Sequence, residues 1–463
     1  MIPTTTIRRC AALLLGVTAI GLVPTAPTAS ALPESQDLGA GGEYFPLTPS
    51  RIYDEEGIDS DSSVTIPVVG VAGVPAENVL AVAVNVTIAN VPGRGFASVT
   101  PSDYEVGSSD PTSLINFQYA GHTVPNFGIV GVGSAGEITV DLTTPKVDGT
   151  ARVVVDIFGF VATSSLADGE EIKVEDGARM VTVTPERLVD TRDADGLTTG
   201  DPVSAGDSID VQVRGVGSVP DRENVSAVVV NMTGINNCQT GERNCQGPSK
   251  QTYLAATPTQ QQGGSETSNG NYPAGVVKAN LAIVPLSEDG RIFVYNNKGE
   301  IHVALDVVAY LEQVDDEETA GRIVPLAAPF RSFDTREPEF GNAKLGYSTW
   351  EDWSFEAFAD SVSLDDVAIG AQSGLFGNLT AVGLERIYPT QEVRSFITMN
   401  PAIDGPFPDE PGNSNLNFDE SGPVSNSAVV TYGSKSDDAY MVSAFNSNGR
   451  THYALDVYAV ILD

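Results

Sequence analysis

The sequence predicts an all-β protein built from three tandem homologous β-sandwich modules of the Greek-key or jelly-roll type. The first observation is a repeat: residues 185–192, Pro-Glu-Arg-Leu-Val-Asp-Thr-Arg, recur closely at 329–336 and in altered form at 49–56. The second is the local pattern, in which short β-branched and aromatic runs are separated by Gly, Pro, Ser and Asp. The third is that no stretch keeps helical periodicity over three turns.

Two series of polar residues fix the register of the repeat. The aspartates of the last predicted strand fall at equal steps of 150 residues, at Asp156, Asp306 and Asp456. The asparagines of an Ala-Val-x-x-Asn-x-Thr strand, or its counterpart, fall at steps of 146 and 147 residues, at Asn85, Asn231 and Asn378. Chance would not keep both spacings, so the three modules are copies of one unit.

The repeat divides the chain into seven segments. We predict a signal peptide at 1–31, a flexible lead at 32–43, module 1 at 44–162, an acidic linker at 163–177, module 2 at 178–312, an acidic linker at 313–322 and module 3 at 323–463. Modules as separate beads are the first expectation, and packing of all three around a pseudo-threefold axis is the alternative.

The N-terminus indicates export. Arg8 and Arg9 precede an apolar run over residues 11–23, and small residues at 29–31 fit a cleavage site. The apolar run is short for a spanning helix, and no later run approaches that length. We therefore expect a secreted protein without a membrane span, with a location on the cell wall as a further option.

Composition narrows the range of partners. The formal net charge is −36, and no basic stretch interleaved with aromatic residues occurs. Phosphate binding relies on clustered Lys and Arg, so a nucleic-acid partner is not expected. Cell-wall glycans or surface proteins remain as partners, and the residues do not determine the oligomeric state.

Only Cys238 and Cys245 remain after the predicted cleavage. Because an exported protein meets oxidising conditions, we predict a disulfide that closes this short polar loop. A zinc site would need further ligands, and neither His nor Cys lies nearby in the sequence.

Taken together, the motifs resemble a repeat of secreted proteins from high-GC Gram-positive bacteria. They are Pro-x-Arg-x-x-Asp-Thr-Arg, Gly-Val-Pro, Ala-Val-x-x-Asn-x-Thr, Leu-Asn-Phe and a closing Val-x-Asp-Val-x-Gly-Tyr strand, and they cover nearly all of the mature chain. Some members carry the repeat beside cell-wall-active domains, so the resemblance implies the cell exterior without implying a reaction. Module 1 departs from it at residues 54–56, and module 3 lacks a clear Gly-Val-Pro.

The Arg/Asp group of the repeated stretch has two interpretations. It comprises Arg187, Asp190 and Arg192 in module 2 and Arg331, Asp334 and Arg336 in module 3. An arginine can bind a carboxylate through two parallel hydrogen bonds, which would fix the first strand and its turn. The other interpretation is a glycan or anion site that uses the second arginine. Repetition in every module favours the structural clamp.

The asparagine and aspartate series also favour structural roles. Residues i and i+2 of a strand share one face, so Asn85 and Thr87 emerge side by side and are expected to satisfy backbone groups at a bulge or sheet junction. His302 and Asp306 share a strand face but stand roughly 13 Å apart, at about 3.3 Å per residue. They cannot hydrogen-bond directly, and we predict neither a catalytic residue nor a metal ligand.

Calcium is the one cofactor that the sequence suggests. Residues 190–196, Asp-Thr-Arg-Asp-Ala-Asp-Gly, cluster three carboxylates before a glycine, and Asp59-Ser-Asp61 is a weaker cluster. The downstream Glu and the flanking helices of an EF-hand are missing, so a solvated turn is the default prediction.

The leading functional hypothesis is a secreted, non-catalytic surface or matrix protein that binds envelope or environmental glycans or proteins. It rests on the signal peptide, the repetition and the lack of a catalytic constellation in the sequence. The alternative is a secreted glycan hydrolase whose site lies in the loops of one module. Paired carboxylates in a cleft of one module would favour that alternative.

Overall fold

The computed structural model describes residues 7–9, 41–104, 112–145, 148–163, 177–194, 199–261, 263–314, 318–356, 363–364, 367–368, 371–388, 393–436 and 438–463. The predicted signal peptide lies outside this set apart from β1 (Ile7–Arg9), which pairs in parallel with β19. Most of the predicted lead and of the first linker also lies outside it. Among the described residues, no helix is long and apolar enough to span a membrane.

Module 1 is a sandwich of two four-stranded antiparallel sheets. Its inner sheet has the order β2-β9-β4-β7, and its outer sheet has the order β3-β8-β5-β6. The strands are β2 (Glu43–Asp59), β3 (Ser62–Pro67), β4 (Val79–Ala89), β5 (Gly95–Pro101), β6 (Ile115–Phe117), β7 (Val124–Gly131), β8 (Glu137–Thr143) and β9 (Thr150–Ala162).

Module 2 repeats this plan, with an inner sheet β10-β17-β12-β15 and an outer sheet β11-β16-β13-β14. Its strands are β10 (Ala178–Asp190), β11 (Ser208–Gln212), β12 (Val225–Asn236), β13 (Thr252–Thr257), β14 (Gly270–Tyr272), β15 (Val276–Pro285), β16 (Arg291–Asn296) and β17 (His302–Gln313).

Module 3 has an inner sheet β18-β28-β22-β25 and an outer sheet β19-β27-β23-β24, with β26 added beside β27. Its main strands are β18 (Ile323–Asp334), β19 (Thr349–Ser354), β22 (Gln372–Glu385), β23 (Arg394–Pro401), β24 (Leu416–Asp419), β25 (Val424–Thr431), β27 (Asp438–Asn446) and β28 (Arg450–Leu462). The small additions are η4 (Pro338–Phe340), β20 (Ser363–Leu364), β21 (Val367–Ala368) and β26 (Gly433–Lys435).

All three modules share one topology. If the eight main strands of each module are counted in chain order, the inner sheet runs first-eighth-third-sixth and the outer sheet second-seventh-fourth-fifth. This is the strand order of a jelly roll, a double-sheet sandwich built from Greek keys. The predicted fold class, three homologous β-sandwiches, is therefore confirmed.

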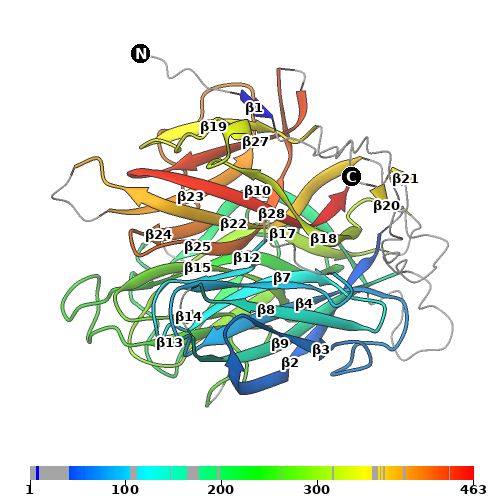
Figure 1. Cartoon of the computed structure of the whole chain (residues 1–463). Coiled ribbons are helices and arrows are strands. Elements are labelled where there is room, and N and C mark those ends of the chain that lie inside the picture. The colour runs from blue at the N-terminus through cyan, green and yellow to red at the C-terminus, as the bar shows by residue number, and fades with distance from the viewer. Residues whose placement is uncertain are drawn as a thin grey trace.

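The modules pack against one another instead of forming separate beads. Register pairing of β10 with β2 joins the inner sheets of modules 1 and 2 into one eight-stranded sheet. The sixth strands of the modules, β7, β15 and β25, contact one another pairwise and so surround a common line, the module axis. In Figure 1 the yellow-to-red strands of module 3 lie above the blue-to-cyan strands of module 1. The pseudo-threefold alternative is the arrangement observed.

The inner sheets are apolar on both faces because both faces are covered. In β12, Val228 and Val230 belong to the core of module 2 itself. The intervening Val229 belongs to a second cluster, which also holds Leu281 and reaches Phe376 of module 3. Strands covered on both faces read as continuous hydrophobic runs, as the valine runs of β4 and β12 do.

One end of the module axis is closed by an ion cluster with one residue from each module. Glu43, only 3% exposed, begins β2 and accepts a hydrogen bond from Arg179 Nε of module 2 at 3.3 Å. Arg322 of module 3 stands 3.8 Å from the same carboxylate oxygen. Beside the cluster, Gly42 exchanges backbone hydrogen bonds with Ile323. The boundary predicted at residue 44 thus falls one residue inside β2.

Candidate functional site

The first strand of each module carries its repeated arginine between two β-bulges. In β10 the register shifts flank Arg187, which faces Asp306 of β17. Bulges re-aim side chains and interrupt regular pairing, so the bulged strand directs the guanidinium at this aspartate. The register continues from Asp306 to Asn231 of β12, which places Arg, Asp and Asn in one row. The equivalent rows are Arg51, Asp156 and Asn85 in module 1 and Arg331, Asp456 and Asn378 in module 3.

In module 2, Arg187 holds two buried carboxylates. Its Nε and Nη2 donate to the two oxygens of Asp306, and its Nη1 donates to Asp190 Oδ2 at 2.9 Å. Arg192 then adds hydrogen bonds to Asp190 from its backbone N–H and its guanidinium. The arginine therefore pairs both locally and across the sheet, and the whole group acts as a clamp.

Module 3 repeats the clamp with the same residue types. Arg331 Nε donates to Asp456 Oδ1 at 2.7 Å, and its Nη2 donates to Asp456 Oδ2 at 3.0 Å. The Nη1 of Arg331 lies 3.5 Å from Asp334 Oδ2, and Arg336 binds Asp334 from the turn. The side chain of Arg336 keeps 46% of its surface exposed, so it can still meet a ligand.

Module 1 builds the same clamp from different residues. Glu56 stands where the second arginine belongs, and Arg152 of the closing strand β9 replaces it. Arg152 donates to the two oxygens of Asp54 at 2.6 and 2.8 Å. Arg51 keeps its role, with Nε 2.8 Å from Asp156 Oδ1. The departure at residues 54–56 therefore preserves the clamp.

The closing-strand histidines complete the clamps of modules 2 and 3. The Thr191 hydroxyl lies 3.0 Å from His302 Nδ1, and Thr335 stands 3.1 Å from His452 Nδ1. His302 Nε2 also lies 2.8 Å from the carbonyl oxygen of Arg243. Burial lowers the pKa of His302 and His452, which favours neutral rings. A histidine with both nitrogens engaged in this way is a structural group.

The rows of Arg, Asp and Asn join each module to the next one. Asp306 Oδ2 accepts the backbone N–H of Ser414 in module 3 at 3.3 Å, and Asn231 Nδ2 donates to the carbonyl oxygen of Ser414. The asparagines thus satisfy backbone groups, as expected, but those of a neighbouring module. The matching contacts are Asp456 and Asn378 with Ser113 of module 1, and Asn85 with Ser268 of module 2.

A second set of asparagines links the modules along the axis. Asn126 Nδ2 donates to Asn378 Oδ1 at 2.9 Å, and Asn426 Nδ2 donates to Asn231 Oδ1 at 2.8 Å. All four are fully buried, where amides need partners. At the junction of modules 1 and 2, the two corresponding side-chain oxygens have no hydrogen-bond partner among the described residues; they belong to Asn85 and Asn280.

Within the clamp of module 2, the pKa values of the two carboxylates shift in opposite directions. Burial raises the pKa of Asp190, but hydrogen bonds from Arg192 and the charges of both arginines outweigh burial, and the net shift is downward. For Asp306 burial dominates and raises the pKa, although Arg187 offsets part of that shift. Removing the arginine partner of such a buried carboxylate destabilises a protein by about 3–5 kcal/mol.

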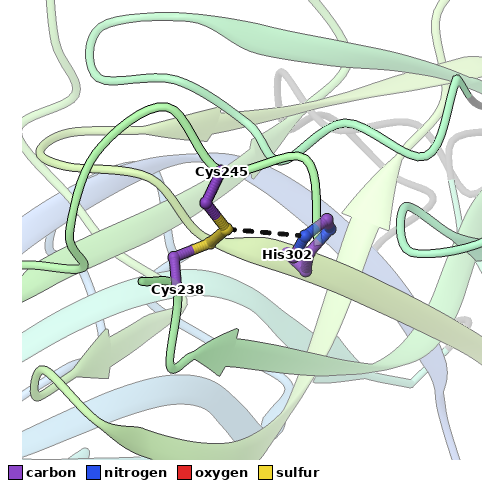
Figure 2. A group of neighbouring side chains, drawn as sticks. All are labelled: Cys238, Cys245 and His302. Carbon is purple, nitrogen blue, oxygen red and sulfur yellow. Dashed lines mark hydrogen bonds between the residues drawn. A yellow bond between two sulfur atoms is a disulfide. The ribbon is translucent and has the colours of Figure 1, made fainter. Parts of the chain in front are cut away.

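The predicted disulfide forms between Cys238 and Cys245, whose Cα atoms are 5.8 Å apart. The fold brings His302 beside it, with Nε2 4.0 Å from Cys245 Sγ, although 57 residues separate the two in the sequence (Figure 2). Two cysteines and a histidine within 4.8 Å resemble zinc ligands. Sulfurs joined in a disulfide are not thiolates, however, so this group fits a metal ion only after reduction.

Among the described residues, no contact supports the calcium hypothesis. Asp190 already accepts hydrogen bonds from two arginines, Arg187 and Arg192, and residues 195–198 lie outside the described set. In the weaker cluster, Asp61 Oδ1 accepts the backbone N–H of Thr144 at 3.0 Å. A bound calcium therefore stays a prediction.

A junction cavity of about 500 Å³ opens between modules 3 and 1. It lies against the clamp of module 3, so Arg331 and Arg336 from the predicted group line it. The other lining residues are Arg94, Gly95, Phe96, Ser113, Asn116, Pro145, Thr380, Val382, Pro423 and Ala454.

An axial cavity of about 290 Å³ lies where β7, β15 and β25 begin, at the end of the axis opposite the Glu43 cluster. All three modules contribute to it through one repeated asparagine each, Asn116, Asn271 and Asn417. Its other polar and aromatic lining residues include Gln118, Tyr119, His122, Lys278, Arg394, Phe396, Phe418 and Asp419.

The two cavities adjoin each other and form one groove. Asn116 lines both, and the neighbours Pro423 and Val424 line one each. Tyr119 stacks on His122 with ring centroids 4.3 Å apart and keeps half of its surface exposed. Apolar walls with a few convergent polar groups are typical of small-molecule sites.

The sequence matches no known family profile and no curated protein. Among solved structures, the chain is similar to one from a study of "The Triple Jelly Roll Fold and Turret Assembly in an Archaeal Virus", with 8% identity, a TM-score of 0.16 and coverage of 90% of this chain and 91% of that chain. A chain of Sulfolobus turreted icosahedral virus matches with 8% identity, a TM-score of 0.15 and coverage of 90% and 96%.

A tandem CBM22 domain of Paenibacillus barcinonensis Xyn10C matches with 9% identity and a TM-score of 0.16. That match covers 61% of this chain and 100% of that chain. TM-scores of 0.15 and 0.16 give no basis for assigning a function to this chain.

Two parts of the site escaped the sequence analysis. The serines that receive the neighbouring module share a Ser-x-x-Asn-aromatic pattern, and they are Ser113, Ser268 and Ser414. That pattern was visible and could have been found by aligning the repeats. Tyr119 and Lys278 have no counterpart in the other modules. Arg394 does correspond to Arg94 of module 1, since each stands two residues before the phenylalanine that pairs with the repeated asparagine, but only the fold brings Arg394 together with Tyr119 and Lys278.

Proposed function

We propose that this chain is a secreted, non-catalytic recognition protein that binds glycans in the groove at its module junctions. The observation that carries the proposal is the composition of the groove. It combines an exposed tyrosine ring, three amide side chains from three modules and several cations in adjoining cavities. Aromatic rings pack on the apolar faces of sugar rings, and amides donate to and accept from hydroxyl groups.

The lining argues against glycoside hydrolysis in this groove. That reaction needs two carboxyl groups about 5–10 Å apart, one on each side of the scissile bond. Among the described residues that line the two cavities, Asp419 is the sole carboxylate. Binding without bond cleavage is the function that this lining supports.

Export rests on separate observations. The predicted signal peptide at 1–31 provides the route, and a disulfide such as Cys238–Cys245 persists in oxidising compartments outside the cytosol. Attachment to the cell wall is compatible with a glycan-binding groove.

Binding to a broad glycan array and sedimentation with purified cell walls test the proposal. We expect binding to be lost in the variant Tyr119→Ala and kept in Tyr347→Ala, a matched control whose ring is 57% exposed outside the groove. Absence of binding in both assays would overturn the proposed function. Equal binding by the two variants would place the site elsewhere.

A further inference from the structure

The groove departs from the charge of the chain as a whole. With 61 acidic and 25 basic residues, the protein is strongly anionic. Many of its arginines are committed to carboxylates, as in the clamps. In contrast, none of the groove residues Arg94, Lys278 and Arg394 lies within ion-pair distance of a carboxylate among the described residues.

Lys278 and Arg394 are the lysine and the arginine that line the axial cavity. Lys278 extends from β15 into a half-buried position, and burial lowers its pKa to about 8. Burial, together with the charge of Lys278, lowers the pKa of His122 to about 4. The lysine therefore faces a neutral imidazole, and a desolvated ammonium without a counter-ion is costly.

The surroundings of Lys278 would orient an anionic sugar. Arg394 begins β23, is exposed, and lines the same cavity. Tyr119, stacked on His122, offers a flat apolar face at the entrance. Asp419 is the one described carboxylate in the lining, and its Oδ1 already accepts the backbone N–H of Ser421 at 2.8 Å.

We propose that the axial cavity selects glycans that carry carboxylate groups, with the carboxylate bound between Lys278 and Arg394 and the sugar ring packed on Tyr119. This inference rests on the proposed glycan-binding function and adds the class of ligand. Asn116, Asn271 and Asn417 would then hydrogen-bond the hydroxyl groups of the same sugar. A carboxylate supplies the counter-ion that Lys278 lacks, and charge-assisted hydrogen bonds are the strong ones in such sites.

The experiment uses matched pairs of ligands on the full mature chain. Oligosaccharides of galacturonan, alginate and hyaluronan are each titrated calorimetrically beside their carboxyl-reduced forms, which keep the backbone and lose the charge. We expect at least one acidic form to bind, and its reduced form to bind at least tenfold more weakly. That preference should disappear in Lys278→Met and shrink in Arg394→Gln, but persist in Lys298→Met, which removes an exposed lysine outside the groove.

Each remaining outcome overturns a defined part of the account. If reduced and acidic forms bind equally, or only neutral glycans bind, the selection of carboxylates is wrong although glycan binding stands. If no glycan of either kind binds here, the inference is wrong, and the proposed function is wrong as well if the glycan array and the cell-wall sedimentation also show no binding. If Lys278→Met keeps the full preference, the carboxylate binds elsewhere.

Discussion

The buried junctions and the open groove are built from different kinds of residue. The rows of Arg, Asp and Asn occur in all three modules, and each joins one module to the next. Tyr119 and Lys278 of the groove occur once each, and the packing of the modules around the axis brings them together. The buried junctions therefore depend on residues that are present in every module, whereas the groove combines repeated asparagines with residues that have no counterpart.

This difference between the junctions and the groove predicts different effects of mutation in the two regions. Substitutions in the junctions should lower stability and affect binding only through unfolding. Substitutions in the groove should change binding and leave stability unaltered. The predictions below test this separation, beginning with the largest effect.

Arg187→Met should destabilise the protein by about 3–5 kcal/mol, because it leaves the carboxylate of Asp306, 1% exposed, without its arginine partner. Denaturant unfolding measures this free energy. The matched control is Arg291→Met, which breaks the more exposed pair with Asp210 and should cost about 0–1 kcal/mol. Similar losses in the two variants would show that the clamp does not stabilise the junction.

Replacing Cys238 and Cys245 together by serine should lower the free energy of unfolding by about 2–3 kcal/mol, since the disulfide closes a short loop. Thermal unfolding of the variant and of the reduced wild-type chain checks this value. Glycan binding should be unchanged, because the loop lines neither cavity. Loss of binding in the folded variant would mean that the groove extends to the Cys238–Cys245 loop.

The clamps should contribute to stability in acid. Asp190 and Asp334 have pKa values lowered in the folded state, so their contribution is present above the unfolded pKa of about 3.9 and is lost as the pH falls through the folded pKa. Arg192→Gln raises the folded pKa of Asp190, so the loss should begin at higher pH. The change should stay below about 1 kcal/mol, because Arg192 is half exposed.

Unfolding curves between pH 2 and pH 6 distinguish the two proteins. Arg222→Gln, which removes a 59% exposed partner of Glu312, serves as the control and should keep the wild-type profile. An unchanged profile in Arg192→Gln would contradict the proposed origin of the shift.

Binding of an acidic glycan should weaken several-fold between pH 7 and pH 9, because Lys278, with a pKa of about 8, loses its charge over this range. The same cavity is lined by Asp419, Arg394, Tyr119 and His122, and His122, with a pKa of about 4, stays neutral over this range. Lys278→Arg keeps the charge and should bind with a flat profile. A wild-type profile that is equally flat would exclude the lysine from the site.

Much of the fold could be predicted, because repetition and strand patterns are local properties of the sequence. The fixed steps between Asp156, Asp306 and Asp456 defined the modules, and the alternation of β runs with turn residues gave their class. The packing of the modules had a signal as well. The run Ala81-Val-Ala-Val-Asn-Val86 lacks polar alternation, which indicates a strand covered on both faces.

The clamp was only half predictable. Arg187 and Asp190 are three residues apart, so their pairing followed from proximity, but the partner Asp306 lies 119 residues away. The sequence predicts that Glu43 belongs to a flexible lead, because no residue near it in the chain indicates that it pairs with Arg179 and Arg322. The asparagines of the groove recur at one position of each module, but nothing in the sequence indicates that the packing of the modules brings them together with Tyr119 and Lys278.

Scanning calorimetry of the mature chain tests the central claim, that the three modules are held as one body by the residues they share. The account predicts a single unfolding transition whose calorimetric and van't Hoff enthalpies agree, because each module completes the burial of its neighbours. Three separable transitions, with Arg187→Met shifting only that of module 2, would contradict it.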